Sequence, residues 1–331
     1  MKIGRIVATL IGLAIAAFLV FEQGFDDVFH ALHLAGWGGL GTITLFHALP
    51  TLLCGIAWWL LLRHHESGSW FLFTWVRWIR DGIDGLLPIL PVSGELVGTR
   101  ILALRGVALA GASIVVDLTA ELMGQLIFAL IGFALLIAIS PGTPYEPWIA
   151  LGIAVMAAQV IGFLVAQKKG LFRLIERPLD WLRKRRRAPE SDADRTLHER
   201  ILLLHRDKAA FVGCILLHLA AWLLGAWESW IGLRFMDHPL GIVAVLAIEG
   251  LVYALRAVTF FIPLGAGVQE GGYVLIGGLL GLPPDLALAL SLLKRGRDLI
   301  TGTPALLLWQ AIEGRALHRA RRGGGLPGLS G

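Results

Sequence analysis

The sequence predicts an all-α protein: a polytopic membrane helical bundle of about seven or eight spans. Of its 331 residues, 56% are hydrophobic and only 16% are charged, and the mean hydropathy is +0.73. Charged residues approach about a quarter of an ordinary soluble domain. Several apolar stretches reach the roughly 20 residues that a membrane-spanning helix needs. Two apolar stretches are also broken by similar segments that carry proline, glycine and glutamate.

Seven segments are long and apolar enough to be predicted as spans. In chain order they are Ile3–Phe21, Gly36–Leu62, Ser113–Ile139, Pro147–Ala166, Ala209–Ile231, Leu240–Ile262 and Asp285–Trp309. Tryptophans stand near several of their ends, where the amphipathic ring suits the headgroup region.

A basic loop divides the chain into two membrane halves, residues 1–166 and 209–331. Thirteen of the 29 Lys and Arg residues lie between Lys168 and Lys208, and such an excess marks a cytoplasmic connection. Within this loop, Arg195–Asp207 has apolar residues clustered between charges and is predicted to form an interfacial helix. The loop 167–208 is therefore predicted to lie inside the cell, against anionic lipid headgroups rather than nucleic acid.

The side on which the C-terminus lies depends on the second break segment. Seven spans place the arginines of the C-terminal tail outside, against the positive-inside rule. Eight spans, with the second break segment crossing the membrane, place them inside. The sequence favours the second count.

The two break segments share one order of residues and form an internal repeat. Aligning Glu95 with Glu270 brings Gly106 onto Gly281, and Ser113–Ile139 onto the last span without a gap. Proline and glycine free backbone groups that lipid cannot satisfy, so such breaks normally line a protein cavity. Duplicated units with discontinuous helices are typical of transporters. The predicted backbone breaks are Pro88, Pro91, Gly94, Pro263, Gly265 and Gly267.

Charged residues inside the predicted spans are the candidate substrate-binding or coupling groups. Each costs roughly 2.5–3.5 kcal/mol at the bilayer centre unless it is paired or hydrated. The candidates are Glu95, Arg100, Asp117, Glu121, Glu249, Arg256, Glu270, Arg295, Arg297 and Asp298.

These charges have two interpretations. Asp117 and Glu121, one helical turn apart, could neutralise Arg295 or Arg297 and fix the helix register. Alternatively, a hydrated cavity could hold an anionic headgroup on its arginines, because the guanidinium fork matches phosphate oxygens, while carboxylates carry coupling protons. The arginines of that cavity would be Arg100, Arg256, Arg295 and Arg297.

One charged segment and the remaining polar residues carry weaker signals. The segment Trp70–Leu90 mixes aromatic residues with four charges, and is predicted as either an interfacial helix or a charged helix that faces the bundle interior. Cys54 and Cys214 lack metal or redox spacing and are predicted to be packing residues. His47 and His218 are expected to bond backbone carbonyls. No metal, cofactor or catalytic residue is predicted.

The break segments resemble the lysylphosphatidylglycerol synthase transmembrane (flippase-domain) superfamily. The resembling stretches are LLPILPVSGELVGTRILALRG with VVDLTAEL, and FFIPLGAGVQEGGYVLIGGLLGLPPDLALALSLLKRGRDL. The length and basic loop are similar to the branch associated with hopanoid biosynthesis. In the family, a glycine–glutamate pair and a downstream arginine recur. The resemblance implies that these correspond to Gly94, Glu95 and Arg100 in the first copy, and to Gly267, Glu270 and Arg295 in the second. Gln269 stands where members more often have arginine. The soluble aminoacyl-transferase domain is not expected in this protein, so aminoacylation of lipid by this protein alone is not expected either.

The resemblance implies a multi-pass protein of the bacterial inner membrane that translocates or otherwise handles a hopanoid or phospholipid. Its predicted partners are membrane lipids, with lipid biosynthesis enzymes as further candidates. The alternative is a non-catalytic scaffold for those enzymes. An intramembrane lipid-tailoring enzyme, with Glu95, Asp117 or Glu270 as general base, is less favoured because no catalytic constellation is visible.

Overall fold

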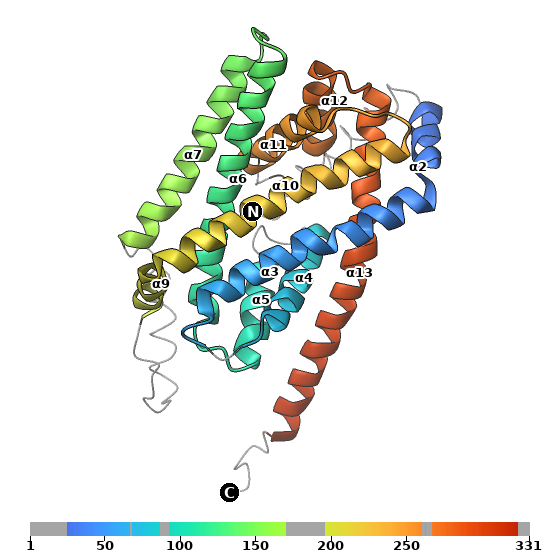
Figure 1. The fold of residues 1–331 in the computed structure, drawn as a ribbon. Helices are drawn as coiled ribbons and strands as arrows, with labels where there is room; N and C mark the ends of the chain where they lie inside the picture. Colours follow the sequence, from blue (N-terminus) through green and yellow to red (C-terminus); the bar gives the residue numbers. More distant parts are fainter. Residues whose placement is uncertain are drawn as a thin grey trace, which may run out of the picture.

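The computed structural model is a helical bundle without strands in the residues it describes, which are 25–66, 68–86, 93–169, 196–259, 262 and 267–323 (Figure 1). The predicted all-α class is therefore confirmed. The predicted first span, the centre of the basic loop, Pro88, Pro91, Pro263 and Gly265 lie outside the described residues.

The helices follow one another through short connections. In chain order they are α2 (Phe25–Phe46), α3 (Ala48–Leu62), α4 (Trp70–Leu86), α5 (Ser93–Leu104), α6 (Ala110–Ile139), α7 (Glu146–Lys168), α9 (Leu197–Arg206), α10 (Lys208–Phe235), α11 (Ile242–Val258), α12 (Val268–Leu279) and α13 (Pro284–Gly323).

Four described segments are long and apolar enough to cross a membrane: Leu32–Leu62, Ala110–Ile139, Glu146–Gln167 and Lys208–Phe235. Each coincides with a predicted span. The first contains a kink at Gly36, whose φ of 53° and ψ of −166° are not helical, and it is divided again between α2 and α3. Helix α13 has 40 residues and is thus about 60 Å long, so its C-terminal part extends well beyond a hydrocarbon core of about 30 Å.

The internal repeat is visible in the backbone. Helices α5 and α12 each have 12 residues, about 18 Å, which is too short to span the membrane. Both begin and end at positions that differ by the offset separating Glu95 from Glu270. Each is followed by a glycine with positive φ, 84° at Gly106 and 85° at Gly281. The next amide bonds back by five residues in both copies, at 3.0 Å (Val107 N to Leu102 O) and 2.9 Å (Leu282 N to Gly277 O).

The two halves are interlocked rather than merely adjacent. Helix α4 of the first half packs along α13 of the second, and α11 of the second half packs along α6 of the first (Figure 1). Glycines let the backbones approach at both crossings. Gly82 lies against Gly302 in one crossing, and Gly250 lies against Gly132 in the other. Small residues at such interfaces are typical of helix pairs in membranes.

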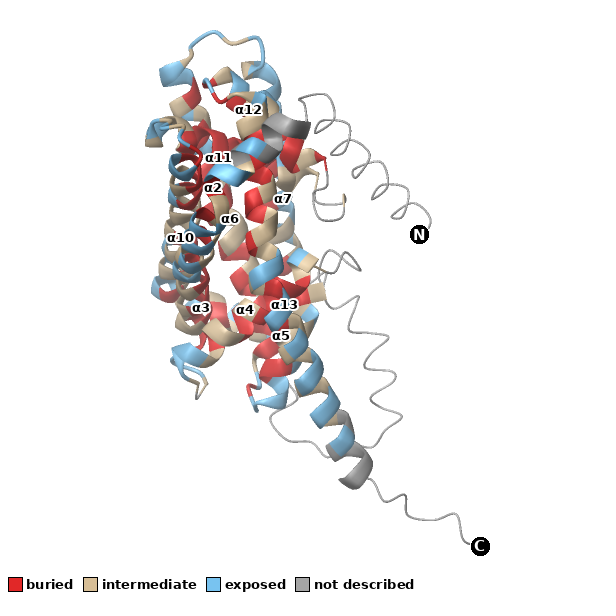
Figure 2. Cartoon of the chain, turned by 90° about the vertical axis from the view of Figure 1, so that its right-hand side faces the viewer, coloured by how far each residue is buried: buried red, intermediate tan, exposed pale blue. Residues whose placement is uncertain are grey.

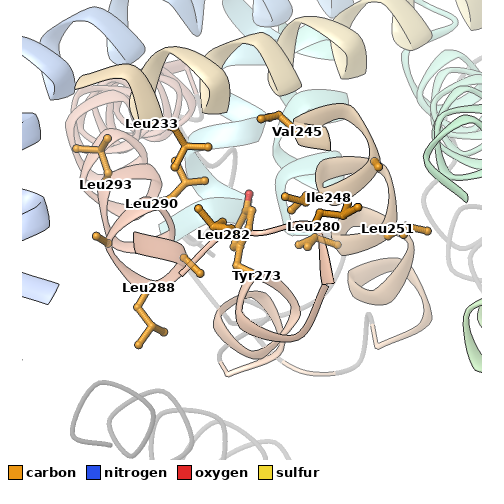
Figure 3. Packing of buried hydrophobic residues seen from close by; sticks show 14 of the residues in the cluster. Leu233, Val245, Ile248, Leu251, Tyr273, Leu280, Leu282, Leu288, Leu290 and Leu293 are labelled. Atoms are coloured by element: carbon orange, nitrogen blue, oxygen red, sulfur yellow. The ribbon is translucent and has the colours of Figure 1, made fainter. Parts of the chain in front are cut away.

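Two apolar clusters form the core, one around α10–α13 and one around α3–α6 with α9. Buried residues run through the centre of the bundle, whereas the far end of α13 is exposed (Figure 2). In the first cluster, Tyr273 of α12 lies among leucines of α10, α11 and α13 (Figure 3). Helix α9, predicted as interfacial, is present, but its Ile201 and Leu204 are buried in the second cluster. Its apolar face is therefore covered by protein.

Adding one methyl group to α4 should have opposite effects at two neighbouring glycines. A Cβ on Gly82 would lie 2.7 Å from Ala305 Cβ and 3.0 Å from Gly302 Cα, whereas one on Gly85 would meet nothing within 4 Å. Gly82→Ala should therefore lower the stability by about 1–3 kcal/mol through overpacking. Gly85→Ala should raise it by up to about 1 kcal/mol through helix propensity. Unfolding in detergent micelles measures both, and equal behaviour of the two variants would contradict the close crossing of α4 and α13.

Candidate functional site

Arg80 of α4 is the hub of the first charge cluster, which consists of Arg77, Arg80, Asp81, Glu95, Asp117 and Glu121. Its guanidinium lies 2.9 Å from an oxygen of Asp117, 2.9 Å from one of Glu121 and 3.3 Å from one of Glu95. These carboxylates come from α5 and α6, so one side chain joins three helices. The side chain of Arg80 is almost fully buried.

Arg77, one turn earlier on α4, completes the first charge cluster. It donates two hydrogen bonds to Glu121, at 2.9 and 2.7 Å, and a third to Asp81 at 2.9 Å. The charged segment Trp70–Leu90 therefore faces the bundle interior over its described part, as one of its two interpretations predicted. The prediction that Asp117 and Glu121 neutralise Arg295 or Arg297 is wrong, because the arginines that bind them, Arg77 and Arg80, lie on α4.

Two carboxylates, on Asp84 and Glu95, connect the break in the first half to α4. Asp84, at the end of α4, accepts a hydrogen bond from the backbone N–H of Gly94 at 2.8 Å, and so satisfies an amide at the start of α5. Glu95 binds Arg80 through one oxygen, and its other oxygen is buried without a hydrogen-bond partner in the described structure. The break predicted at Gly94 is thus fixed to α4 by two separate contacts.

Lys294 of α13 is the hub of the second charge cluster, which consists of Glu228, Glu249, Glu270, Lys294, Arg295, Arg297 and Asp298. Its ammonium lies 2.9–3.0 Å from both oxygens of Glu249 and 2.9 Å from the hydroxyls of Ser229 and Tyr273. A serine, a lysine and a tyrosine in contact could suggest nucleophilic catalysis. Here both oxygens of the wholly buried Glu249 lie within 3.0 Å of the lysine nitrogen, so the lysine is engaged in an ion pair. The arrangement is a structural ion pair.

Glu228 of α10 is a second buried carboxylate in this cluster. It accepts hydrogen bonds from Arg297 and lies 2.9 Å from Nδ1 of His47, while Arg297 also binds the adjacent Asp298. The expectation that His47 bonds a backbone carbonyl is wrong. His218 likewise lies 3.0 Å from a carboxylate oxygen of Asp117. Both histidines were predicted to be locally satisfied, but each joins helices distant in sequence.

Glu270 holds the second break. It accepts a hydrogen bond from the Gly267 N–H at 2.9 Å and one from Arg295 at 2.7 Å, and so ties α12 to α13. Gly267, one of the predicted break positions, has a φ of 75°, so its backbone is not helical. The next residue back in the helix, Gln269, accepts a hydrogen bond from Arg256 at 3.0 Å.

Arg100 lies apart from both clusters. It pairs at 2.6 Å with Glu313 in the part of α13 that extends beyond the bundle, and its side chain is 52% exposed. Hydrogen bonds from Arg100 lower the pKa of the Glu313 carboxyl. The predicted grouping of Arg100 with Arg256, Arg295 and Arg297 is therefore not found among the described residues. Arg256 and Arg295 are instead linked through Gln269, Ser291 and Glu270, and Glu95 and Glu270 form ion pairs with different arginines.

A small cavity of about 50 Å³ lies instead where α3, α4 and α13 meet. Asp81 of the first cluster and Asp298 of the second both line it, with side chains 33% and 38% exposed. A carboxylate at membrane depth that is not buried by protein must meet water, because the cost of exposing it to lipid is too high. The cavity is lined by His47, Thr51, Trp78, Asp81, Gly82, Gly85, Asp298 and Thr301.

Most carboxylates of the two clusters were predicted from the sequence, but their hubs, Arg80 and Lys294, were not. Arg77 and Arg80 are three positions apart on an amphipathic helix, and that spacing was the signal that could have placed them on one buried face. Lys294 stands beside two arginines, so its burial could not be distinguished from theirs in the sequence.

The comparison with known proteins identifies the family. The family model for the lysylphosphatidylglycerol synthase TM region matches residues 6–305, which include both break segments and both charge clusters. Neither a curated protein nor a solved structure matches the chain. The match to a transmembrane region agrees with the apolar helices described above. The chain therefore belongs to the lysylphosphatidylglycerol synthase transmembrane-region family and is a membrane protein linked to lipid handling.

Proposed function

We propose that this protein translocates a lipid, a hopanoid or a phospholipid, between the leaflets of the bacterial inner membrane. The observation that carries the proposal is the pair of repeated units, each with a short broken helix fixed by a glutamate. Alternating access in many transporters is a movement of one repeat against the other around a site at their interface. The interlocking of α4 with α13 and of α11 with α6 supplies such an interface.

In this proposal the movement depends on two ion pairs, each of which can be formed or broken. Glu95 ties α5 to α4, and Glu270 ties α12 to α13. Each glutamate is near a break, so the short helix can swing if its ion pair exchanges partners or its carboxylate takes a proton. The cavity lined by Asp81 and Asp298 lies between α3 and α4 of the first half and α13 of the second. Water would enter the interface between the halves there first. We assign no enzymatic role, because the Ser229–Lys294–Tyr273 contact is neutralised by Glu249.

Replacing Glu95 and Glu270, the two glutamates that hold the short helices, by glutamine should slow lipid exchange. Glu95→Gln leaves Arg80 with two carboxylates, and Glu270→Gln leaves an Arg295 that is 30% exposed, so both variants should still fold. In proteoliposomes, loss of a fluorescent phospholipid from one leaflet should become at least tenfold slower, which corresponds to about 1.4 kcal/mol in barrier height.

The matched control is Glu313→Gln, which removes an exposed carboxylate outside the clusters. Its exchange rate should equal that of the unaltered protein. Unchanged rates in the Glu95→Gln/Glu270→Gln variant would overturn the transport proposal. They would favour a scaffold for lipid biosynthesis enzymes, in which the basic loop, and not the ion pairs, carries the function.

A further inference from the structure

Three donor atoms of different chemistry converge on α10 and α6. Cys214 and His218 are four positions apart and share one face of α10, and Asp117 projects toward them from α6. The sulfur of Cys214, a ring nitrogen of His218 and an oxygen of Asp117 all lie within 4.8 Å of one another. All three residues are buried.

The separations approach those of a metal site. The Asp117 oxygen lies 3.0 Å from Nε2 of His218 and 3.8 Å from Sγ of Cys214. Around a tetrahedral zinc ion, with bonds of about 2.0–2.3 Å, such donors stand roughly 3.3–3.6 Å apart. Shifts of a few tenths of an ångström would therefore bring the measured Asp117 separations into range.

The charges around these atoms call for a cation. The first charge cluster has four carboxylates, on Asp81, Glu95, Asp117 and Glu121, and two guanidiniums, on Arg77 and Arg80. Asp81 is one-third exposed at the cavity, so the largely buried groups are three carboxylates and two guanidiniums, with a formal excess of one negative charge. Uncompensated buried charge is costly, and a bound cation would offset this excess.

The neighbouring arginine does not occupy the donor side of Asp117. Arg80 binds Oδ2 of Asp117, whereas His218 and Cys214 face Oδ1. A ligating carboxylate is normally held by such an outer hydrogen bond.

We propose that Asp117, Cys214 and His218 bind a divalent transition-metal ion of the zinc type. Thiolate and imidazole donors favour such an ion over Mg²⁺ or Ca²⁺. The ion would link α6 of the first half to α10 of the second. The spacing of Cys214 and His218 places two donors on one helix face, but spacing could not indicate the third, because Asp117 lies 97 positions before Cys214.

The test uses the full chain, purified in detergent without a histidine tag. Elemental analysis after incubation with Zn²⁺ and removal of loose ions should find about one ion per chain. Exchange with Co²⁺ should give the near-ultraviolet band of a cobalt–thiolate bond. Cys214→Ser should abolish this band, and His218→Asn should weaken metal affinity at least tenfold.

Cys54→Ser is the matched control, since Cys54 is a second buried thiol and is not one of the three clustered donors. It should keep both the ion and the cobalt band. Size-exclusion profiles establish that the variants fold. The proposal is overturned if the unaltered protein retains no ion, or if Cys214→Ser and Cys54→Ser retain it equally. Neither result bears on lipid exchange, which is measured separately.

Discussion

Replacing Lys294 by methionine should destabilise the protein by about 3–5 kcal/mol, because it leaves the wholly buried carboxylate of Glu249 without a cation. The hydroxyls of Ser229 and Tyr273 still donate to Glu249 at 2.5 and 2.6 Å, but neither supplies charge. The loss should be measurable as a lower unfolding midpoint in mixed micelles, followed by tryptophan fluorescence.

A double-mutant cycle separates the ion pair from simple packing. Glu249→Gln alone should also destabilise, since it leaves the ammonium of Lys294 buried and unpaired. The combined variant Glu249→Gln/Lys294→Met should recover most of the loss, because no uncompensated charge remains. Additive losses would contradict the assignment of Lys294 as the hub of this cluster.

Replacing Arg80 by lysine should slow lipid exchange at least tenfold, although the charge is kept. The guanidinium reaches Asp117 through Nη1 and both Glu121 and Glu95 through Nη2, whereas lysine presents one point charge on a flexible stem. Glu95 would be the contact most easily lost, because its 3.3 Å distance is the longest of the three. Helix α5 should then detach more readily, which hydrogen exchange of its amides would detect.

Arg100→Lys is the control for that substitution. Arg100 makes an exposed pair with Glu313, and exposed pairs contribute only about 0–1 kcal/mol. Lipid exchange and amide protection in α5 should both remain as in the unaltered protein. If Arg80→Lys behaved like Arg100→Lys, Arg80 would not be the element that holds the first break.

Two sets of residues show what can and cannot be predicted from neighbouring positions in the sequence. The paired glycines Gly106 and Gly281 and the shared spacing around Glu95 and Glu270 predicted the repeat, and both glycines adopt the same positive φ. Such features are local, because a short helix and its C-terminal turn depend on a few consecutive residues. The partners of Asp117 were not predictable in this way, since charges of either sign stood in many spans.

Residue pattern was enough to predict a helical membrane bundle, the course of its main apolar helices and two similar units with interrupted helices. Hydrophobic length and glycine–proline placement suffice for these predictions, because lipid forces each backbone group to be satisfied within its own helix. Which charges meet could be learned from the folded chain alone. It paired Arg77 and Arg80 with α6, Lys294 with α11, and His218 and Cys214 with Asp117. Those choices depend on how α4 crosses α13 and α10 lies along α6, and crossing geometry follows from side-chain packing across distant segments rather than from spacing along the chain.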